Sequence, residues 1–334
     1  MVSVLLPVRN GAAALERAVQ SIRAQTLRRW ELILVDDGST DETPALIRRL
    51  AAADERIRPV RPGRIGLARA LNAGLAVARA PFIARMDADD ESHPERLEGQ
   101  LARLGADASL GVLGCRVVFG GDPQQAAGYA RHVAWLNGLL TPEAIALNRF
   151  IDAPLAHPSV MIRRECFDRH GAWRDGDFPE DYELWLRWID AGVRCAKAPE
   201  SWLVWNDPPR RLSRTHPRYR PQAFNRIKAD YLARELRRTL AGRELWIWGA
   251  GRMARRRAAG LERHGLRIAG YIDIDPKKTR AHRLGRPVRL PEGLPPADRA
   301  FVVSCVGALG AREIIRGFLL DRGRIEGRDF LMAA

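Results

Sequence analysis

Cysteine is rare in this chain of 334 residues, and long apolar runs are missing. Scattered single cysteines, without a Cys-x-x-Cys pair, argue against a disulfide framework and against a zinc site, and they fit a reducing cytoplasm. The longest apolar stretch, AFVVSCVGALG (300–310), is well short of the ~20 residues that a membrane-spanning helix needs. The four cysteines are Cys115, Cys166, Cys195 and Cys305.

Lysine is also scarce, so the net charge of +15 comes almost entirely from arginine. A strongly basic chain can indicate nucleic-acid binding when its cations gather on one face. Here the arginines occur along the whole sequence, and we therefore expect no nucleic-acid partner. An anionic substrate or an anionic membrane surface accounts better for the charge. Lysine stands only at Lys197, Lys228, Lys277 and Lys278.

The composition, with 46% apolar and 28% charged residues, is typical of soluble globular proteins. The N-terminal stretch MVSVLLPVRNG has no basic segment ahead of its apolar residues, and Pro7 and Asn10 interrupt it early. We expect a strand there and not a signal peptide. The length of the chain allows two domains.

Apolar strands and amphipathic helices alternate in the first part of the chain. This alternation predicts βαβ units and an α/β fold with a mostly parallel sheet flanked by helices. Ligands of such sheets bind beyond the carboxyl ends of the strands, and the stretches PVRN, DDGSTD and DADD stand at those ends. The expected strands are 3–8, 30–37, 56–60 and 82–86, and the expected helices are 12–25, 42–52 and 66–79.

Residues 111–205 are less regular. The stretch EDYELWLRWIDAG predicts an amphipathic helix over 180–192 that Gly192 closes. The pattern is weakest over 120–160, which we expect to be irregular and to shape the substrate pocket. Strands are expected near 111–119, 158–163 and 201–205.

A Pro- and Arg-rich stretch, DPPRRLSRTHPRYRP (207–221), marks a boundary in the chain. We interpret it as a solvated linker, and contact with anionic lipid or a lipid-diphosphate acceptor is the alternative. A strand–helix pattern restarts at residue 243. The expected parts are a first domain over 1–210, the linker and a helix over 211–241, and a small α/β domain over 242–334.

Three carboxylates, Asp87, Asp89 and Asp90, follow the expected strand at 82–86. Side chains alternate in an extended segment, so Asp87 and Asp89 can point to the same side. Two converging carboxylates repel each other unless a cation joins them, and Mg²⁺ or Mn²⁺ prefers oxygen ligands together with phosphates. The cluster therefore indicates a metal–diphosphate site. A solvated turn that begins the next helix is the alternative.

Two further carboxylate pairs stand at element ends. Asp36 and Asp37 close the second expected strand, where a carboxylate can accept hydrogen bonds from a base or a ribose. Glu180 and Asp181 open the helix at 180–192. Acidic residues in a first turn favour the helix dipole, and that role alone would explain this pair. The other explanation is a general base, which takes a proton from an attacking hydroxyl.

Five sequence blocks match one known pattern in order and spacing. They are VSVLLPVRNG, ELILVDDGSTDET, GLARALNAGLAVARAPFIARMDADDESHPERLEGQ, HPSVMIRRE and EDYELWLR. On these blocks the chain over 1–205 resembles the family 2 glycosyltransferases, which are inverting enzymes of the GT-A fold. The resemblance implies a domain that binds a nucleotide-diphospho-sugar.

A nucleotide site at the ends of the first two strands is implied by this resemblance. Asp37 would hydrogen-bond the base, with Asp36 nearby. The family often has an aromatic residue where Arg9 stands, and a guanidinium can stack on a base in its place. The backbone that would frame the nucleobase runs through Pro7, Val8, Arg9 and Asn10.

The resemblance also implies the groups at the reacting end. Asp89 would bind Mg²⁺ or Mn²⁺, and Asp87, followed by Ala88, would face the ribose or the metal. Asp181 would be the catalytic base, with Glu180 as its neighbour.

A single displacement is the reaction that the resemblance implies. Asp181 would deprotonate an acceptor hydroxyl, which attacks the anomeric carbon of a UDP-, dTDP- or GDP-linked sugar opposite the diphosphate. His157 falls where the family often has a histidine near the donor or acceptor, and a purely structural histidine is the alternative. The acceptor would be a saccharide or a lipid-linked compound in surface polysaccharide or glycoconjugate synthesis. Such an enzyme is expected in the cytoplasm, with peripheral contact at the inner face of the membrane.

The last part of the chain contains WIWGAGRMARR, with glycines and an alanine in the order G-x-G-x-x-A between a strand and a helix. Gly249, Gly251 and Asp273, which ends the next strand, form a candidate second nucleotide site in a Rossmann-like domain. An NAD(P)-dependent oxidoreductase is therefore the alternative function, although no obvious catalytic His, Lys or Tyr set accompanies it. A structural or regulatory role is the other explanation of these glycines.

Overall fold

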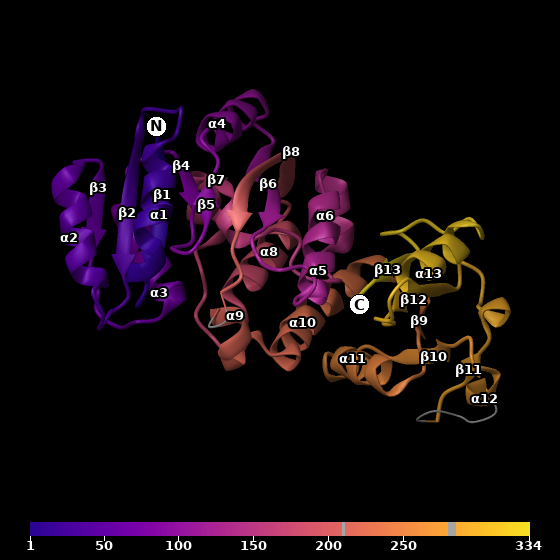
Figure 1. The fold of residues 1–334 in the computed structure, drawn as a ribbon. Coiled ribbons are helices and arrows are strands. Elements are labelled where there is room, and N and C mark those ends of the chain that lie inside the picture. Colours follow the sequence, from indigo (N-terminus) through magenta and orange to yellow (C-terminus); the bar gives the residue numbers. More distant parts are fainter. Residues whose placement is uncertain (209–210, 280–284) are drawn as a thin grey trace. The chain divides into compact units, whose positions relative to one another are not determined.

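The computed structural model describes residues 1–208, 211–279 and 285–334, and it divides into two compact units (Figure 1). The first unit holds the carboxylate-rich segments, and the second holds the glycine-rich turn. Their bounds are Met1–Ala146 with Pro154–Tyr219 for the first unit, and Leu147–Ala153 with Arg220–Ala334 for the second.

An eight-stranded sheet forms the centre of the first unit. Its strands are β1 (Val2–Val8), β2 (Trp30–Asp36), β3 (Ile57–Val60), β4 (Phe82–Arg85), β5 (Glu91–Ser92), β6 (Leu110–Phe119), β7 (Met161–Arg163) and β8 (Arg194–Trp205). They lie in the order β3-β2-β1-β4-β7-β6-β8-β5. The first four in this order pair in parallel, β7 is antiparallel to both neighbours, and β6 pairs in parallel with β8. The expected mostly parallel α/β sheet is confirmed.

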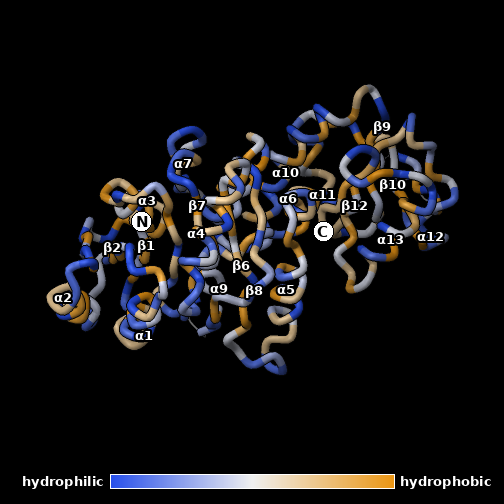
Figure 2. Tube along the Cα trace, turned by 90° about the horizontal axis from the view of Figure 1, so that it is seen from above, coloured by the Kyte–Doolittle hydropathy of each residue, from blue (hydrophilic) through white to orange (hydrophobic). Residues whose placement is uncertain are grey.

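Helices cover both faces of this sheet because its central strands are apolar on both sides. The helices are α1 (Ala12–Arg23), α2 (Thr43–Ala53), α3 (Leu67–Val77), α4 (Arg96–Ala106), α5 (Ala127–Gly138), α6 (Pro142–Asn148), α7 (Arg164–His170) and α8 (Glu180–Asp190). Leu6 of β1 shares a core cluster with α1, α2, α4 and α5, whereas Leu5 shares one with α3, α6, α7 and α8. Hydrophilic and hydrophobic residues alternate along the turns of α2 (Figure 2).

The main departures from the expected elements lie between 111 and 205. β8 begins at Arg194 and not near 201, because its polar, proline-containing start continues the ladder to β6 through register shifts. The stretch 120–160, expected to be irregular, contains α5 and α6. Gly192 closes α8 as predicted: it has φ 87°, and its N–H donates to the Ile189 carbonyl at 3.0 Å.

A five-stranded parallel sheet forms the centre of the second unit. Its strands are β9 (Glu244–Trp248), β10 (Ile268–Ile272), β11 (Val288–Arg289), β12 (Ala300–Ser304) and β13 (Phe330–Met332). They lie in the order β11-β10-β9-β12-β13, which is the strand order of a Rossmann-like fold. The helices are α10 (Pro221–Thr239), α11 (Arg252–Arg263), α12 (Pro276–Thr279) and α13 (Ala311–Leu320). The second, small α/β fold expected from the sequence is therefore present.

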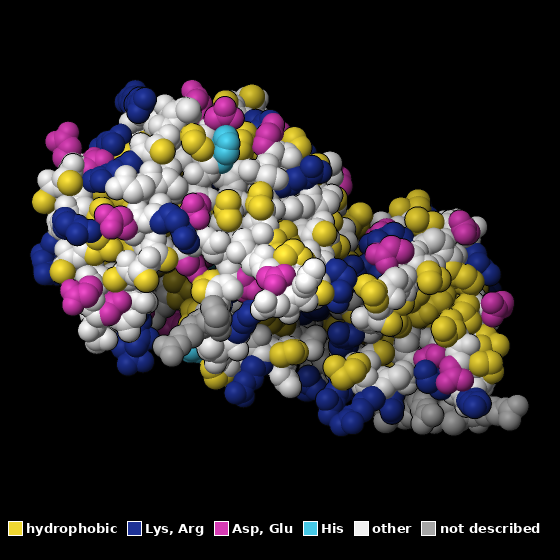
Figure 3. Space-filling view, in the orientation of Figure 1, with side chains coloured by type: hydrophobic (Ala, Val, Ile, Leu, Met, Phe, Trp, Pro, Cys, Tyr) yellow, Lys and Arg dark blue, Asp and Glu magenta, His cyan; other side chains and the backbone are white. Residues whose placement is uncertain are grey.

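The surface charge of the first unit is mixed on the face seen in Figure 3. Lys and Arg side chains are scattered there among acidic ones, and they form no single basic stripe on that face. Within the described ranges, no helix combines the length and the apolar character that crossing a bilayer requires.

Gly74 lets α3 lie close to β1 and β2. A Cβ atom at this position would stand 2.2 Å from Leu5 Cδ1 and 2.7 Å from Val35 Cγ2. Gly105, near the end of α4, offers a contrast, because a Cβ atom there would meet no described atom within 4 Å.

Gly74→Ala should therefore destabilise the first unit, whereas Gly105→Ala should not. The first change is expected to lower the free energy of unfolding by about 1–3 kcal/mol, because overpacking displaces the neighbouring side chains. The second should raise it by about 0.5–1 kcal/mol, because alanine loses less conformational entropy than glycine in a helix. Urea denaturation of the full chain measures both, and equal effects of the two changes would contradict this packing.

Candidate active site

A cavity of about 830 Å³ opens in the first unit beside the carboxyl ends of β1, β2 and β4. Its wall consists of the turn after β1, the loops after β2 and β4, the start of α8 and the segment that follows β8. The lining residues that the sequence predicted are Pro7, Val8, Arg9, Asn10, Asp37, Asp87, Ala88, Asp89, His157, Glu180 and Asp181.

Hydrogen bonds join two loops at the end of the cavity where the nucleotide is expected. Asn10 has a left-handed conformation with φ 49°. Its N–H donates to Ser39 Oγ at 2.9 Å, and its Oδ1 accepts the Thr40 N–H at 2.8 Å. Gly38 has φ 70°, and a Cβ atom there would lie 2.8 Å from the Arg64 backbone nitrogen. This turn therefore requires glycine.

The adjacent carboxylates Asp36 and Asp37 lie in different surroundings. Asp37 lines the cavity, and its Oδ1 accepts the N–H groups of Ile65 at 2.7 Å and Gly66 at 2.8 Å. Asp36 is missing from the lining residues in the described part of the chain, and its Oδ1 accepts the Ser39 N–H at 2.9 Å. The structure thus places Asp37 at the cavity, whereas Asp36 stabilises the turn beneath it.

Asp87, Asp89 and Asp90 form an acidic cluster in which one oxygen of each lies within 4.8 Å of the others. Burial and the charge of Asp87 raise the pKa of Asp89 to about 6. Burial and both neighbouring carboxylates raise the pKa of Asp90 well above its ordinary range. The Oδ2 atom of Asp90 is buried and finds no hydrogen-bond donor in the parts of the chain that are described. Protein groups thus compensate this negative charge only in part.

Asn206, directly after β8, fixes the loop that carries this cluster. Its N–H donates to Asp90 Oδ1 at 2.9 Å, and its Nδ2 donates to the Asp89 carbonyl oxygen at 2.7 Å. The alternative of a simple helix start does not fit, because Glu91–Ser92 form β5 and α4 begins only at Arg96.

Arg85 places a buried guanidinium beside the acidic cluster. It is the last residue of β4, it is 2% exposed, and its Nη1 forms an ion pair with Asp87. Burial raises the pKa values of Asp89, Glu180 and Asp181, and the positive charge of Arg85 offsets part of each rise. Arg85 therefore acts on the acidic cluster and on the carboxylates of α8 together.

Glu180 and Asp181 reach the cavity from the first turn of α8. Burial and the charge of Glu180 raise the pKa of Asp181 to about 7. Burial also raises the pKa of Glu180, whose two oxygens accept the Tyr219 hydroxyl at 2.9 and 2.7 Å. A carboxylate at a cavity wall with a pKa near neutrality has the property that a general base requires.

His157 is anchored in the core and is also part of the cavity wall. Burial, together with the charge of Arg85, lowers the pKa of this histidine well below its ordinary value. Its Nε2 accepts the Trp173 Nε1–H at 3.0 Å, so the proton of the neutral ring belongs on Nδ1. His157 is thus held by a structural contact in the core and at the same time lines the cavity.

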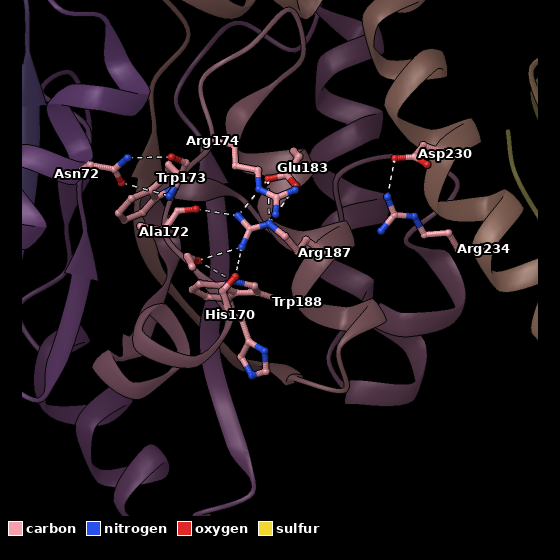
Figure 4. A network of polar contacts seen from close by, with 11 residues as sticks. Asn72, His170, Ala172, Trp173, Arg174, Glu183, Arg187, Trp188, Asp230 and Arg234 are labelled. Carbon is pink, nitrogen blue, oxygen red and sulfur yellow. Dashed lines mark hydrogen bonds and ion pairs between the residues drawn. The ribbon is translucent and has the colours of Figure 1, made fainter. Parts of the chain in front are cut away.

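A network around Arg187 holds α8 against the segment before it (Figure 4). Arg187 donates from Nε to Glu183 Oε1 at 3.0 Å and from Nη2 to the Ala172 carbonyl at 2.7 Å. Trp173 in the same segment exchanges two hydrogen bonds with Asn72 of α3. These contacts fix the helix whose first turn carries the candidate base.

The Arg-rich stretch contributes to the cavity wall, although we expected a solvated linker. Its residues belong to the first unit as α9 (Leu212–Thr215) and the 3₁₀ turn Pro217–Tyr219. The linker interpretation is wrong for this part, because Tyr219 and Arg218 lie against the buried Glu180 carboxylate. Residues 209–210 of the stretch lie outside the described residues. The described residues of the stretch that line the cavity are Pro208, Arg211, Leu212, Ser213, His216, Arg218 and Tyr219.

Comparison with known proteins identifies the family. A family model described as Glycosyl transferase family 2 matches residues 3–171. This chain belongs to the family 2 glycosyltransferases. The match ends before α8, so Asp181 and the wall segment after β8 lie beyond it.

Relatives of this family 2 glycosyltransferase include two bacterial proteins. The putative glycosyltransferase EpsE of Bacillus subtilis is 32% identical over 202 residues, which cover 58% of this chain and 68% of that protein. The amylovoran biosynthesis glycosyltransferase AmsE of Erwinia amylovora is 29% identical over 203 residues, with coverage of 60% and 74%. The chain spans between 26% and 68% of the length of the first curated relatives that it matches.

Among solved structures, that of TarS residues 1–349 from S. aureus, in complex with UDP-GlcNAc, resembles this glycosyltransferase with a TM-score of 0.54. The sequence identity is 16%, and the likeness covers 71% of this chain and 72% of that one. The two proteins share a fold, which confirms the expected GT-A architecture of the first unit.

A hard divalent cation fits the acidic cluster of this glycosyltransferase. The buried, unpartnered Oδ2 of Asp90 and the raised pKa of Asp89 both show carboxylates that lack positive charge. A cation such as Mg²⁺ or Mn²⁺ supplies that charge through oxygen ligands. The sequence named Asp87 and Asp89 as ligands, and the structure adds Asp90 to the group.

In the second unit, the side chain of Asp273, which follows β10, is hydrogen-bonded to the glycine-rich turn. Its Oδ2 accepts the Ala250 N–H at 2.8 Å, and Lys278 Nζ lies 3.1 Å from each of its oxygens. The carboxylate that would bind a ribose in a dinucleotide site is therefore already paired. The oxidoreductase alternative finds no support here.

The two glycines of this turn differ in whether their position has room for a side chain. Gly249 has φ 110°, and a Cβ atom there would stand 2.8 Å from Val306 Cγ2 and 2.9 Å from Ala254 Cβ. At Gly251, which precedes α11, a Cβ atom would meet none of the described atoms within 4 Å. Backbone geometry and packing therefore explain Gly249 without a ligand, which agrees with the structural explanation of the motif.

Sequence reasoning missed four residues of the site: Arg85, Asn206, Arg211 and Tyr219. Arg85 carries a signal, since a charged residue at the end of an apolar strand is unusual unless it is paired. Arg211 lies 4.4 Å over the Trp205 ring and donates to the Tyr129 hydroxyl. Nothing in the local pattern of 205–219 indicates the contacts with Tyr129, Glu180 and Asp90, because these join segments that are distant in the sequence.

Tyr219→Phe should destabilise the first unit in a pH-dependent way. A hydrogen bond to a charged group contributes about 1.5–3 kcal/mol. Burial raises the pKa of Glu180, and the Tyr219 hydroxyl favours the charged form of this carboxyl, so the contact matters more as the pH rises and Glu180 ionises. The loss in free energy of unfolding should be larger at pH 8 than at pH 4.5, as urea denaturation at both pH values can measure. In a Glu180→Gln background the pH dependence should vanish, and an equal loss at both pH values would contradict the contact.

Proposed function

We propose that this chain is an inverting glycosyltransferase that moves a sugar from a nucleotide-diphosphate donor to a hydroxyl acceptor. The observation that carries the proposal is the convergence of Asp87, Asp89 and Asp181, distant in the sequence, on one cavity. Family membership supports the reaction class. The related TarS structure contains UDP-GlcNAc, a donor of the proposed kind.

The donor would lie along the wall formed by the loops after β1, β2 and β4. Asp37 and the backbone of Pro7 to Asn10 would contact the base of a UDP-, dTDP- or GDP-linked sugar, with the Arg9 guanidinium available for stacking. Asp87 and Asp89, with Asp90 behind them, would hold Mg²⁺ or Mn²⁺. Bound there, the cation would neutralise negative charge on the diphosphate.

Asp181 would remove the proton from the acceptor hydroxyl. Burial and Glu180 keep its pKa near 7, so at neutral pH it is ionised in part and still basic enough to accept a proton. Tyr219 and Arg218 hold Glu180 in place. An acceptor bound on the Asp181 side attacks opposite the diphosphate, and this direction of attack inverts the anomeric carbon.

The proposed acceptor is a saccharide or a lipid-linked compound, in the synthesis of a surface polysaccharide or glycoconjugate. The relative AmsE is named for amylovoran biosynthesis, which supports this setting. We place the reaction in the cytoplasm, with peripheral contact at the inner face of the membrane. All four cysteines are free and buried, as suits a reducing compartment.

Asp89→Ala and Asp181→Asn should impair the protein in different ways. In a panel of UDP-, dTDP- and GDP-sugars with Mn²⁺ or Mg²⁺, Asp89→Ala should lose metal-dependent donor binding, and EDTA should have the same effect on the unmodified chain. Asp181→Asn should keep donor binding but lose about 10²–10⁴-fold in turnover, because the proton acceptor is gone. Asp190→Asn, at the far end of α8, is the matched control. Full activity of both site variants would overturn the assignment.

Turnover at saturating donor should rise with pH through about 7, because Asp181 must be deprotonated and its pKa is raised to that value. Glu180→Gln removes the neighbouring negative charge and should lower the pKa of Asp181. The midpoint of the pH–rate profile should therefore move to lower pH, as initial rates between pH 5 and pH 9 would show. A midpoint that stays in place or moves upward would refute Asp181 as the base.

A further inference from the structure

Arg85 has the position of a residue that contacts substrate. Its backbone is fixed on both sides: its N–H donates to the Val160 carbonyl at 2.9 Å, and its carbonyl accepts the Arg96 Nη2–H at 2.6 Å. The residue is 2% exposed and still lines the cavity. A rigid strand end thus presents this guanidinium to the interior of the site.

The hydrogen-bonding capacity of Arg85 is not used up within the protein. Nη1 pairs with Asp87, whereas the buried Nε has no acceptor among residues 1–208, 211–279 and 285–334. A buried donor without a partner is unfavourable, so nearly all such groups in folded proteins are satisfied. Arg85 also lines the cavity, so its guanidinium is placed to donate a hydrogen bond to a molecule bound there.

The place of Arg85 in the cavity wall indicates which part of that molecule it meets. It pairs with Asp87 of the acidic cluster, and it lines the same cavity as Asp89 and Asp181. In a single displacement the transferred sugar lies between the diphosphate, at Asp89, and the acceptor, at Asp181. A guanidinium in the wall beside the acidic cluster is therefore placed next to the sugar.

We propose that Arg85 positions the transferred sugar by donating its free N–H to a sugar hydroxyl oxygen, while the same guanidinium holds Asp87. This inference rests on the proposed glycosyltransferase function. It makes Arg85 a determinant of donor-sugar recognition, because a planar guanidinium presents its donors in a fixed direction. Lysine cannot replace it, since an ammonium group offers its donors from one point.

The simpler alternative is that Arg85 only neutralises Asp87 and does not contact the sugar. A ratio of two affinities distinguishes these two roles. The measured quantity is the dissociation constant of a nucleoside diphosphate divided by that of its sugar conjugate. Calorimetry gives it for UDP and UDP-glucose, dTDP and dTDP-glucose, and GDP and GDP-mannose, each with Mn²⁺ and with Mg²⁺. The full chain carries Asp181→Asn in all samples, so that the donor is not consumed.

Arg85→Met and Arg85→Lys should lower this ratio about tenfold or more, the equivalent of one hydrogen bond to a charged donor. The decrease should appear with either cation. Arg49→Met, which removes an exposed arginine of α2 that is not among the described residues lining the cavity, is the control and should leave the ratio within about twofold. If Arg85→Met does not fold, Arg85→Lys and Arg85→Gln decide the question.

The outcomes distinguish this inference from the function on which it rests. An unchanged ratio, or an equal loss of affinity for the nucleoside diphosphate and its conjugate, would overturn the role of Arg85 alone. Failure of the parent protein to bind any of the six compounds would overturn the proposed function, and the role of Arg85 with it.

Discussion

Buried negative charge that the protein only partly neutralises is the constraint on which the first unit depends. Burial raises the pKa values of Asp89, Asp90, Glu180 and Asp181, so each of these carboxyls is held away from its preferred solvated state. Structural carboxylates elsewhere in the unit are paired, as Glu31 is with Arg58 at 2.6 Å. A chain of net charge +15 that still leaves carboxylates uncompensated at one cavity is arranged to receive positive charge there.

The fold supplies the rigidity that such an arrangement needs. Parallel strands end at one edge of the sheet, and hydrogen bonds from Asn10 and Asp37 tie the loops at that edge to one another. On the opposite wall, Arg187 and Trp173 fix α8 to the segment before it. The acidic loop is held by Asn206 and α8 by Arg187, so the acidic groups stand on segments that hydrogen bonds fix. Their charge is available to a bound cation and to a proton of the acceptor.

Local sequence patterns predicted the parallel part of the sheet, the helices α1, α2, α3 and α8, and the strand ends that carry the acidic residues, because these follow from periodicity and turn chemistry. They missed α5 and α6, in the stretch expected to be irregular. They could not separate Asp36 from Asp37, since only the turn geometry decides which carboxylate faces the cavity. They also predicted a linker in the stretch that contains Tyr219. Its role depends on Glu180, 39 residues away in the sequence, and no local pattern records such a contact. Arg85 was overlooked although its charge at the end of an apolar strand is a local signal, because the cavity that it lines forms only in the folded chain.

Electron–nuclear double resonance on Mn²⁺ bound to the full chain tests the central claim most directly, with UDP, dTDP or GDP present at saturation. We predict a hyperfine coupling to ³¹P, because the cation held by the acidic cluster must be coordinated directly by the diphosphate. Mn²⁺ that binds the chain but shows no ³¹P coupling with any of the three nucleotides would contradict it.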